Sequence, residues 1–355
     1  MTPLVSVVIP SYNHGRYIAA AVRSVLEQSL HDLELIVVDD GSHDDSLAVL
    51  AKFDDRRMRV VAQQNRGAHA AINAGLDLAQ GEFLAILNSD DVYHRERLAA
   101  LVSELRSDPR RGLAASHLEI IDAQGVVTGV KHGYRDLSPY ALPHPERSFR
   151  AGDDLRHALT TENYLATTSN FVFTRELWRT LHEFRPLRYA HDWDFALRAA
   201  RCSEIVLLPR PLLQYRIHGA NTIRERGALL AFESCWCMVT HLPMILRDAL
   251  SESPHVLQQM LHSLHHHDAG GMFVAALFAQ LSGRSDAERE ALAVQLLDPQ
   301  HPLRRTHLEY LMQQFDERPM APAVNPDNLM ARARDLLRDG LSAVAYRLRR
   351  AVRTS

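Results

Sequence analysis

The chain runs from the apolar stretch Phe83-Leu84-Ala85-Ile86-Leu87 straight into Asn88-Ser89-Asp90-Asp91. A short apolar run bounded by polar residues predicts a buried strand. Adjacent carboxylates at its end repel each other and lose hydration unless a positive charge joins them. A hard divalent cation that carries a phosphate-bearing ligand fits this requirement. The alternative is a helix cap, in which Asp90 or Asp91 begins a helix from about Tyr93 to Leu105.

The same arrangement of an apolar run and a polar end occurs three more times before residue 83. Apolar runs at residues 5–9, 33–38 and 58–61 alternate with helical patterns at 17–26, 44–53 and 68–79. Such alternation predicts a parallel sheet with right-handed crossovers, and ligands bind such sheets beyond the carboxyl ends of the strands. Four polar clusters therefore meet at one edge and predict a binding site there: Pro10-Ser11-Tyr12-Asn13, Asp39-Asp40-Gly41-Ser42, Gln64-Asn65-Arg66-Gly67 and Asn88-Ser89-Asp90-Asp91.

The turns between these elements narrow the class of ligand. The first turn, Ser11-Tyr12-Asn13-His14-Gly15, lacks the Gly-x-Gly-x-x-Gly pattern, which disfavours a nicotinamide or flavin dinucleotide. No Gly-x-x-x-x-Gly-Lys-Ser/Thr sequence is present, which excludes a P-loop. An aromatic and an amide after the first strand, acids after the second and a carboxylate pair after the fourth suit a nucleoside diphosphate held partly through a metal.

Together these motifs resemble family-2 glycosyltransferases of the GT-A fold, over residues 4–224. Any one of the motifs is common, and their order along the chain makes the resemblance specific. The set comprises Val7-Val8-Ile9-Pro10-Ser11-Tyr12-Asn13, Val37-Val38-Asp39-Asp40-Gly41-Ser42, Asn65-x-Gly67-x-x-x-Ala71-x-Asn73-x-Gly75, Ser89-Asp90-Asp91, His191-Asp192-Trp193-Asp194 with Arg198, and Tyr215-Arg216-Ile217-His218-Gly219-x-Asn221-Thr222.

The resemblance implies a mostly parallel, Rossmann-like sheet of the GT-A type, with helices on both faces and an α-helical region after it. The expected catalytic domain is 1–224, with a nucleotide-sugar half at about 1–110 and an acceptor half at about 111–224, and the helical region is 225–355. The implied activity is inverting transfer of a sugar from a UDP- or dTDP-sugar to a hydroxyl of a glycan or lipid-linked acceptor. Bacterial relatives use such transfer in surface polysaccharide or glycan synthesis.

The resemblance also implies roles for particular positions. Asp192 would be the general base that deprotonates the acceptor hydroxyl. Asp91 would ligate Mn2+ or Mg2+, with His218 as a further ligand. The donor would be bound by Pro10, Tyr12, Asn13, Asp40, Asn65, Gly67, Asn73 and Asp90.

Three positions depart from the usual family pattern. Asn88 stands where many relatives have the first Asp of a D-x-D motif, Ile72 replaces a common Arg, and His191 replaces the Glu before the base. These departures leave open a nucleotide-sugar-binding or scaffold protein with weakened catalysis. A sugar nucleotidyltransferase is a third reading, but the first turn offers no Gly-rich basic loop.

Simple structural roles are the alternative for several of these residues. Asp39, Asp40 and Asp192 could cap the helices that follow them, and His218 could be a structural histidine. Tyr12 could be a packing aromatic. Asn65, Asn73 and Gly75 could serve as turn and cap residues around one helix.

Composition predicts a cytoplasmic enzyme that binds no nucleic acid. The 355 residues are 46% hydrophobic, and the net charge of −3 provides no general attraction to nucleic acid. Three cysteines without zinc spacing argue against a disulfide framework or a zinc site. The sequence shows no basic signal-peptide start and no apolar run of membrane-spanning length.

The second half of the chain has fewer chemical motifs. A β-hairpin is expected from 113–121 and 126–130, followed by a long loop at 132–160 and by helices to the end. The last segment, 341–353, has one apolar face surrounded by arginines, so it could lie on the inner face of an anionic membrane or dock on a protein surface. We expect the helical region to serve assembly, for example as a homo-oligomer. The expected helices are 226–250, 254–268, 270–282, 285–297, 303–315 and 327–351.

Overall fold

The computed structural model describes residues 2–132, 135–136, 159, 163–219, 227–252 and 285–316. The chain divides into two compact units, residues 1–312 and 313–355, and nearly all described residues belong to the first. The helices expected at 254–268, 270–282 and 327–351, the segment 341–353 and most of the loop expected at 132–160 lie outside the described residues. The expected boundary at residue 224 stays a prediction.

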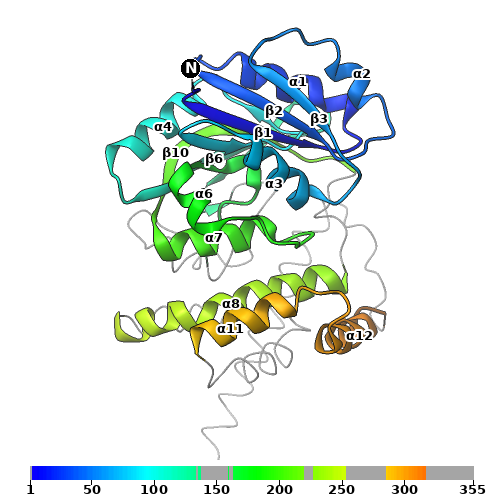
Figure 1. Ribbon diagram of the computed structural model, residues 1–355, viewed down its shortest axis with the longest axis vertical. Helices are drawn as coiled ribbons and strands as arrows, with labels where there is room; N and C mark the ends of the chain where they lie inside the picture. The colour runs from blue at the N-terminus through cyan, green and yellow to red at the C-terminus, as the bar shows by residue number, and fades with distance from the viewer. Residues whose placement is uncertain are drawn as a thin grey trace, which may run out of the picture. The chain divides into compact units, whose positions relative to one another are not determined.

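The first unit is built around a ten-stranded sheet with helices on both faces (Figure 1). The strands are β1 (Val5–Ser11), β2 (Leu33–Asp39), β3 (Met58–Ala62), β4 (Phe83–Ile86), β5 (Val92–Tyr93), β6 (Arg111–Ile121), β7 (Val127–His132), β8 (Arg135–Asp136), β9 (Val172–Thr174) and β10 (Glu204–Arg216). The described helices are α1 (Gly15–Leu26), α2 (Ser46–Leu50), α3 (Ala68–Leu78), α4 (Arg97–Ser107), α6 (Arg175–Leu181), α7 (His191–Cys202), α8 (Ala228–Glu252), α11 (Asp286–Gln295), α12 (Pro302–Asp316) and the 3-10 turn η2 (Thr168–Asn170).

The order of the strands confirms the mostly parallel sheet. It runs β3-β2-β1-β4-β9-β6-β10-β5, with β7 and β8 attached to β6. The first four strands are mutually parallel, as are β6 and β10. β9 is antiparallel to both β4 and β6, so it joins the two parallel halves of the sheet. The expected hairpin is also present, as the antiparallel pair β6 and β7.

Alternate side chains of the parallel strands enter two separate cores. Val8 and Ile36 join the core under α3, α6 and α7, whereas Val7 and Val37 join the core under α1 and α4. Because both faces are covered, these strands are mostly apolar, as the sequence pattern predicted. On α3, a Cβ added at Gly75 would lie 2.3 Å from Val8 Cγ1, so glycine lets this helix lie directly against the sheet.

The element boundaries exclude a simple capping role for the two acids after β4. Helix α4 begins at Arg97, with Glu96 as its N-cap residue, and not near Tyr93 as one alternative proposed. Val92 and Tyr93 form β5, which pairs antiparallel with β10. Asp90 and Asp91 therefore lie in a loop between two strands.

The described helices after residue 227 pack on the same hydrophobic core as α7. Phe232 and Trp236 of α8 are fully buried in the same core as Phe195 of α7, and the Trp236 indole donates a hydrogen bond of 3.0 Å to the carbonyl of Ala293 in α11. The helical region was predicted to have apolar faces that must be buried. For α8 and α11, these faces are buried against other parts of the same chain.

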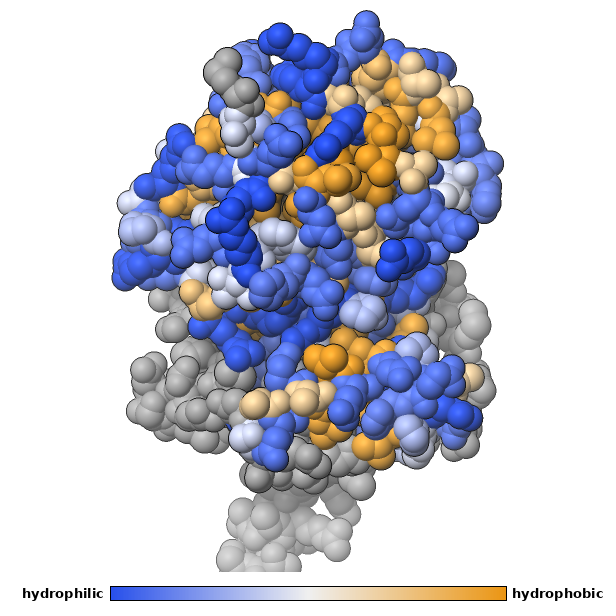
Figure 2. All heavy atoms as spheres, viewed as in Figure 1, coloured by the Kyte–Doolittle hydropathy of each residue, from blue (hydrophilic) through white to orange (hydrophobic). Residues whose placement is uncertain are grey.

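Hydrophilic side chains cover most of the face drawn in Figure 2, and hydrophobic ones gather over the sheet and over α11. The exposed large hydrophobic residues include Val60 in β3, Leu78 in α3 and Val294 in α11. Among the helices in the described ranges, none combines the length and the apolar character needed to cross a membrane.

Candidate active site

The loop after β4 is held in place by the turn at residues 167–169. Asn88 donates from its backbone to Ser169 Oγ at 2.9 Å and from its side-chain amide to Thr167 Oγ1 at 3.0 Å. Its amide oxygen accepts from the Thr168 hydroxyl at 3.0 Å. This position uses both a donor and an acceptor, which an asparagine provides and a carboxylate does not. The departure from the usual Asp at residue 88 therefore has a structural reason.

The Asp91 carboxylate is enclosed by the protein. One oxygen accepts from the Ser169 hydroxyl at 2.5 Å, and the other accepts from the backbone N–H of Arg216 at 2.9 Å. Burial, reinforced by the charge of Asp90, raises the pKa of Asp91 well above its usual range. Asp91 thus ties the loop to β10 and η2, and neither oxygen is left without a protein partner.

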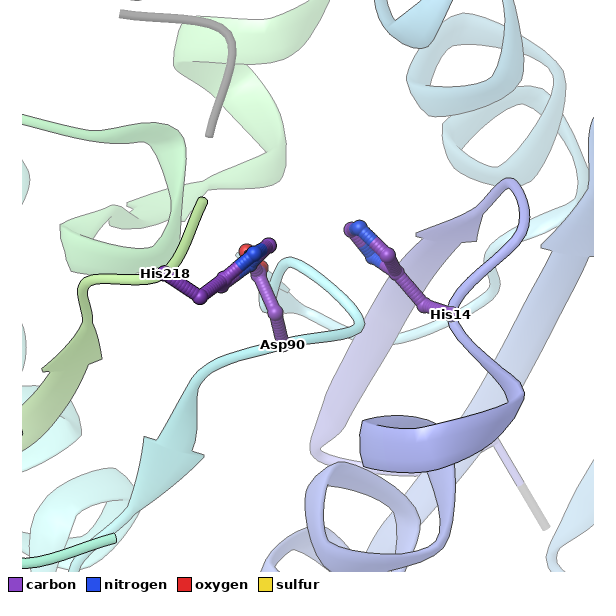
Figure 3. A group of neighbouring side chains, drawn as sticks. All are labelled: His14, Asp90 and His218. Atoms are coloured by element: carbon purple, nitrogen blue, oxygen red, sulfur yellow. The ribbon is translucent and has the colours of Figure 1, made fainter. Parts of the chain in front are cut away.

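The Asp90 carboxylate instead faces two histidines (Figure 3). His218 Nε2 lies 2.9 Å from Asp90 Oδ2, and His14 Nδ1 lies 2.7 Å from the hydroxyl of the neighbouring Ser89. One ligand atom from each of His14, Asp90 and His218 lies within 4.8 Å of the others. His218, predicted as a ligand, is thereby placed beside Asp90 and not Asp91.

His14 is the member of this cluster that the sequence interpretation missed. It sits in the β1–α1 turn, where Tyr17 follows one helical turn later, and its ring lies 5.7 Å from that of His218 between centroids. Tyr17 also packs on His218 at 4.9 Å. The sequence could have identified His14, because it directly follows Tyr12 and Asn13, two polar residues predicted to bind the donor at the end of the first strand.

Asp39 and Asp40, at the end of β2, also differ in their contacts, as Asp90 and Asp91 do. Asp40 accepts hydrogen bonds from the Gln63 amide (2.7 Å) and from the backbone N–H groups of Arg66 (2.9 Å) and Gly67 (2.8 Å). Its carboxylate therefore holds the β3–α3 loop, in which Gly67 has a φ of +89°. Asp39 is buried as well, but its Oδ2 has no hydrogen-bond partner among the described residues.

The end of β1 contributes a second buried polar side chain that has an atom without a hydrogen-bond partner among the described residues. Ser11 is paired with Asp39 across β1 and β2, and its buried hydroxyl also lacks a partner among the described residues. Neighbouring Pro10 is buried in the strand, whereas Tyr12 is 43% exposed. Both atoms lie at the carboxyl ends of parallel strands, where ligands bind such sheets, so this pair is a candidate ligand contact.

Three other predicted donor residues, two in turns and one in α3, contact or flank neighbouring loops. Asn13, with a φ of +53°, links the β1 and β2 turns, because its backbone N–H donates to Ser42 and its amide oxygen accepts from the N–H of His43. Asn65 is exposed on the β3–α3 loop. Asn73 makes a two-point contact with the backbone of Phe184, at 2.9 and 2.8 Å, and so holds the segment that leads to α7.

Asp192 lies in the first turn of α7, and its carboxylate has two protein contacts. Oδ1 accepts from the backbone N–H of Trp193 at 2.7 Å, and Oδ2 accepts from the Asn163 amide at 3.1 Å. Ala190, and not Asp192, is the N-cap residue of this helix. Only 7% of Asp192 is exposed, and burial raises the pKa of its carboxyl to about 7. A carboxyl that titrates near neutral pH is suited to general base catalysis.

A short segment joins Asp192 to the loop after β4. Asn163, the hydrogen-bond donor to Asp192, accepts from the backbone N–H of Ala166 at 3.2 Å. The next residue, Thr167, accepts from Asn88. Residues 163–169 therefore connect the raised-pKa carboxylate with the loop that bears Asp90. Asn163 and Ser169 belong to no motif identified in the sequence.

Asp194 has the opposite environment. It is fully buried and contacts Arg185 (3.0 Å), Arg198 (2.9 Å) and His241 (3.1 Å). Although burial acts in the other direction, Arg198, the hydrogen bond from His241 and Arg185 together hold the pKa of Asp194 well below its usual range. Asp194 is thus a fixed charge inside α7, and Asp192 is the carboxylate of this pair that can exchange a proton.

Comparisons with known sequences show similarity to glycosyltransferases. The family model described as "Glycosyl transferase family 2" matches residues 6–181. The chain is 38% identical to the glycosyltransferase GlyG of Streptococcus pneumoniae serotype 4 over 231 residues, which cover 63% of this chain and 74% of GlyG. It is 31% identical to an uncharacterized glycosyltransferase of Nostoc sp. over 61% of this chain and 66% of that protein, which is just under two thirds of its length.

Solved structures share the fold at lower identity. The mannosyltransferase PcManGT from Pyrobaculum calidifontis, in complex with GDP-Man and Mn2+, has a TM-score of 0.52 and 21% identity, covering 89% of this chain and 87% of its own. S. aureus TarS 1–349 in complex with UDP has a TM-score of 0.53 and 17% identity, covering 90% of this chain and 94% of its own. The fold is thus of the GT-A type. The match to the family-2 model, together with 38% identity over 74% of GlyG, shows that the chain belongs to glycosyltransferase family 2.

Proposed function

We propose that this protein transfers a sugar, with inversion at the anomeric carbon, from a nucleoside-diphosphate sugar to an acceptor hydroxyl. The observation that carries the proposal is the buried Asp192, whose pKa is raised to about 7 and which residues 163–169 connect to the Asp90 loop. A base and a cluster able to hold a diphosphate-bound cation at one edge of the sheet are what such a transfer requires.

We place His14, Asp90 and His218 in the proposed metal site, and we revise the earlier assignment of Asp91. Both Asp91 oxygens have protein partners, whereas Asp90 faces the two imidazoles, and the three ligand atoms are close enough for one ion to contact all of them. Two imidazoles and one carboxylate make a softer set than the all-oxygen ligands that Mg2+ prefers, so the cluster favours Mn2+. When bound, such an ion supplies positive charge opposite the leaving diphosphate.

The donor nucleotide is assigned to the edge formed by β1 and β2. The unpartnered Asp39 Oδ2 and Ser11 hydroxyl support a hydrogen-bonded contact with base or ribose, and the exposed Tyr12 offers a stacking face. We prefer Asp39 to Asp40 for this contact because Asp40 already accepts three hydrogen bonds. Asn65, Gly67 and Asn73 then act by shaping the neighbouring loops.

The chain's own residues suffice to describe the proton and bond changes. Asp192 accepts the proton of the acceptor hydroxyl as that oxygen forms a bond to the anomeric carbon. On the opposite side of this carbon, the bond to the diphosphate oxygen breaks, and its electron pair leaves with the diphosphate. The Asn163 amide and the Trp193 N–H fix the direction in which the Asp192 carboxylate points. One displacement of this kind inverts the anomeric centre.

A screen for nucleotide release tests the proposal and its alternative. The protein is incubated with UDP-GlcNAc, UDP-glucose, a dTDP-sugar and GDP-Man, with Mn2+ or with excess chelator, and free nucleoside diphosphate is measured. We expect release from at least one donor that depends on Mn2+ and is lost in Asp192→Asn. Binding of UDP and Mn2+ without release from any donor would instead support the weakened binding or scaffold protein.

The remaining partners stay proposals. A glycan or lipid-linked acceptor, a homo-oligomer and contact of residues 341–353 with the inner face of a membrane are compatible with a role in polysaccharide synthesis. Hydrophobic contacts of α8 and α11 within the chain reduce the apolar surface that an oligomer would need to bury.

A further inference from the structure

The side chain of Glu233 in α8 is buried yet fully hydrogen-bonded. Only 1% of the residue is exposed. Its carboxylate accepts from three consecutive backbone N–H groups, those of Arg188 (2.9 Å), Tyr189 (2.7 Å) and Ala190 (3.2 Å). Burying a carboxylate is costly unless it is well bonded, and three N–H donors satisfy it as an anion.

The three donors lie directly before the proposed base. Ala190 is the N-cap residue of α7, and its carbonyl accepts the first helical bond from the N–H of Asp194. Asp192 follows two residues after Ala190. Fixing residues 188–190 therefore fixes the position and direction of the first turn of α7, on which Asp192 stands.

Other contacts hold the earlier part of the same segment. Asn73 binds the backbone of Phe184 at two points, and Arg185 pairs with Asp194. Neither contact reaches residues 188–190. The Glu233 carboxylate accepts from all three of these N–H groups and so holds the later part of the segment.

Glu233 also acts on Asp192 electrostatically. Its negative charge adds to burial in raising the pKa of Asp192. The other groups that face it are Arg304 in α12, whose charge favours the ionised carboxylate, and the buried Cys237 thiol one turn along α8. Burial raises the pKa of Glu233 itself, and the three N–H bonds oppose that rise.

We propose that Glu233 is a positioning residue of the transfer reaction, which holds the start of α7 through three backbone N–H groups and places a negative charge beside Asp192. This inference rests on the proposed function. It gives α8 a role in setting the position and the pKa of Asp192. This helix lies outside residues 6–181, the segment that matches the family model. Glu233 touches no reacting atom in this role and acts through the loop and the base.

The test compares three variants in the nucleotide-release assay across pH, using the nucleotide sugar that the wild type hydrolyses fastest with Mn2+. Glu233→Gln keeps the shape and removes the charge, and Glu233→Asp keeps the charge and shortens the reach. The control is Trp236→Phe, on the same helix, which removes the hydrogen bond from the indole to Ala293 and leaves the bonds between Glu233 and residues 188–190 in place.

We expect Glu233→Gln to lower kcat by about tenfold, with KM for the donor unchanged, because a displaced base loses rate and not donor binding. The acid limb of its pH profile should move to lower pH, because removing a negative charge eases ionisation of Asp192. Glu233→Asp should lower kcat and leave the limb in place, and Trp236→Phe should leave both the limb and KM in place.

The inference would be overturned if the acid limb of the pH profile of Glu233→Gln stays where it is in the wild type, or if it shifts by the same amount in Trp236→Phe. Either result would leave the proposed function intact. If Glu233→Gln is recovered unfolded, full kcat in folded Glu233→Asp would overturn the inference instead. Absence of turnover or of an acid limb in the wild type would overturn the proposed function and this inference together.

Discussion

Replacing Asp192 by asparagine should make the protein more stable at alkaline pH. Burial raises the pKa of this carboxyl from 3.8 to about 7 in the folded chain. A raised carboxyl pKa means that the folded state holds the proton more tightly than the unfolded state. The contribution of Asp192 to stability is therefore greatest below about pH 4, declines as the pH rises and is most unfavourable above about pH 7.

The size of the effect follows from that shift. About three pKa units at roughly 1.4 kcal/mol each give an unfavourable contribution of about 4 kcal/mol at pH 8. A neutral asparagine avoids this unfavourable contribution. It offers one hydrogen-bond acceptor fewer than the carboxylate for the contacts with Trp193 and Asn163, at a cost of about 1 kcal/mol. The net gain is about 3 kcal/mol at pH 8, falling to below about 1 kcal/mol at pH 5.

Urea denaturation of both proteins at pH 5 and pH 8 measures this difference directly. The same substitution should reduce turnover by about 10²-fold or more while nucleotide binding persists. A variant that is less stable than the wild type at pH 8, or whose stability changes equally at both pH values, would refute the account of a buried carboxyl with a raised pKa.

Three further perturbations probe the rest of the site and the fold. Asp194→Asn should lower the free energy of unfolding by about 3–5 kcal/mol, because it leaves buried guanidinium groups without their counter-charge, and urea denaturation measures it; a change below about 1 kcal/mol would contradict the buried charge cluster. Gly75→Ala should destabilise by about 1–3 kcal/mol, since its Cβ would meet Val8, whereas Gly227→Ala, with nothing within 4 Å, should not; equal effects in thermal melts would contradict the close helix–sheet contact. Removing residues 341–355 should reduce binding to anionic liposomes without changing nucleotide release; unchanged liposome binding would exclude membrane contact through this segment.

The parallel sheet was predictable because its strands are buried on both faces. Runs such as Leu33–Val38 and Phe83–Leu87 are apolar at every position or nearly so, and polar residues mark where each strand ends. The rule that ligands bind at these ends predicts a site at this edge, where the structure brings Asp90 together with His14 and His218. Boundaries were less predictable, as α4 shows, because pairing of β5 with β10 depends on residues more than a hundred positions away.

Which member of each acidic pair faces the site was not predictable from the sequence. Successive side chains at the end of a strand point in opposite directions, which separates Asp39 from Asp40, whereas the directions of Asp90 and Asp91 are set by the turn in the loop after β4. Asp91 turns toward Ser169 and Arg216, and Asp40 turns toward the loop at 63–67. These partners are distant in the sequence and carry no motif. The contacts of Glu233 were hidden for the same reason, since its donors precede it by more than forty residues.

The proposed single displacement is tested most directly by the configuration of the released sugar. An α-linked nucleotide sugar that the protein hydrolyses with Mn2+ is followed by proton NMR, and the anomeric signals are recorded before mutarotation equilibrates them. Water activated by Asp192 attacks opposite the diphosphate, so the β-anomer should appear first, and its appearance should slow by about 10²-fold or more in Asp192→Asn. First appearance of the α-anomer, or an undiminished rate in Asp192→Asn, would contradict the account.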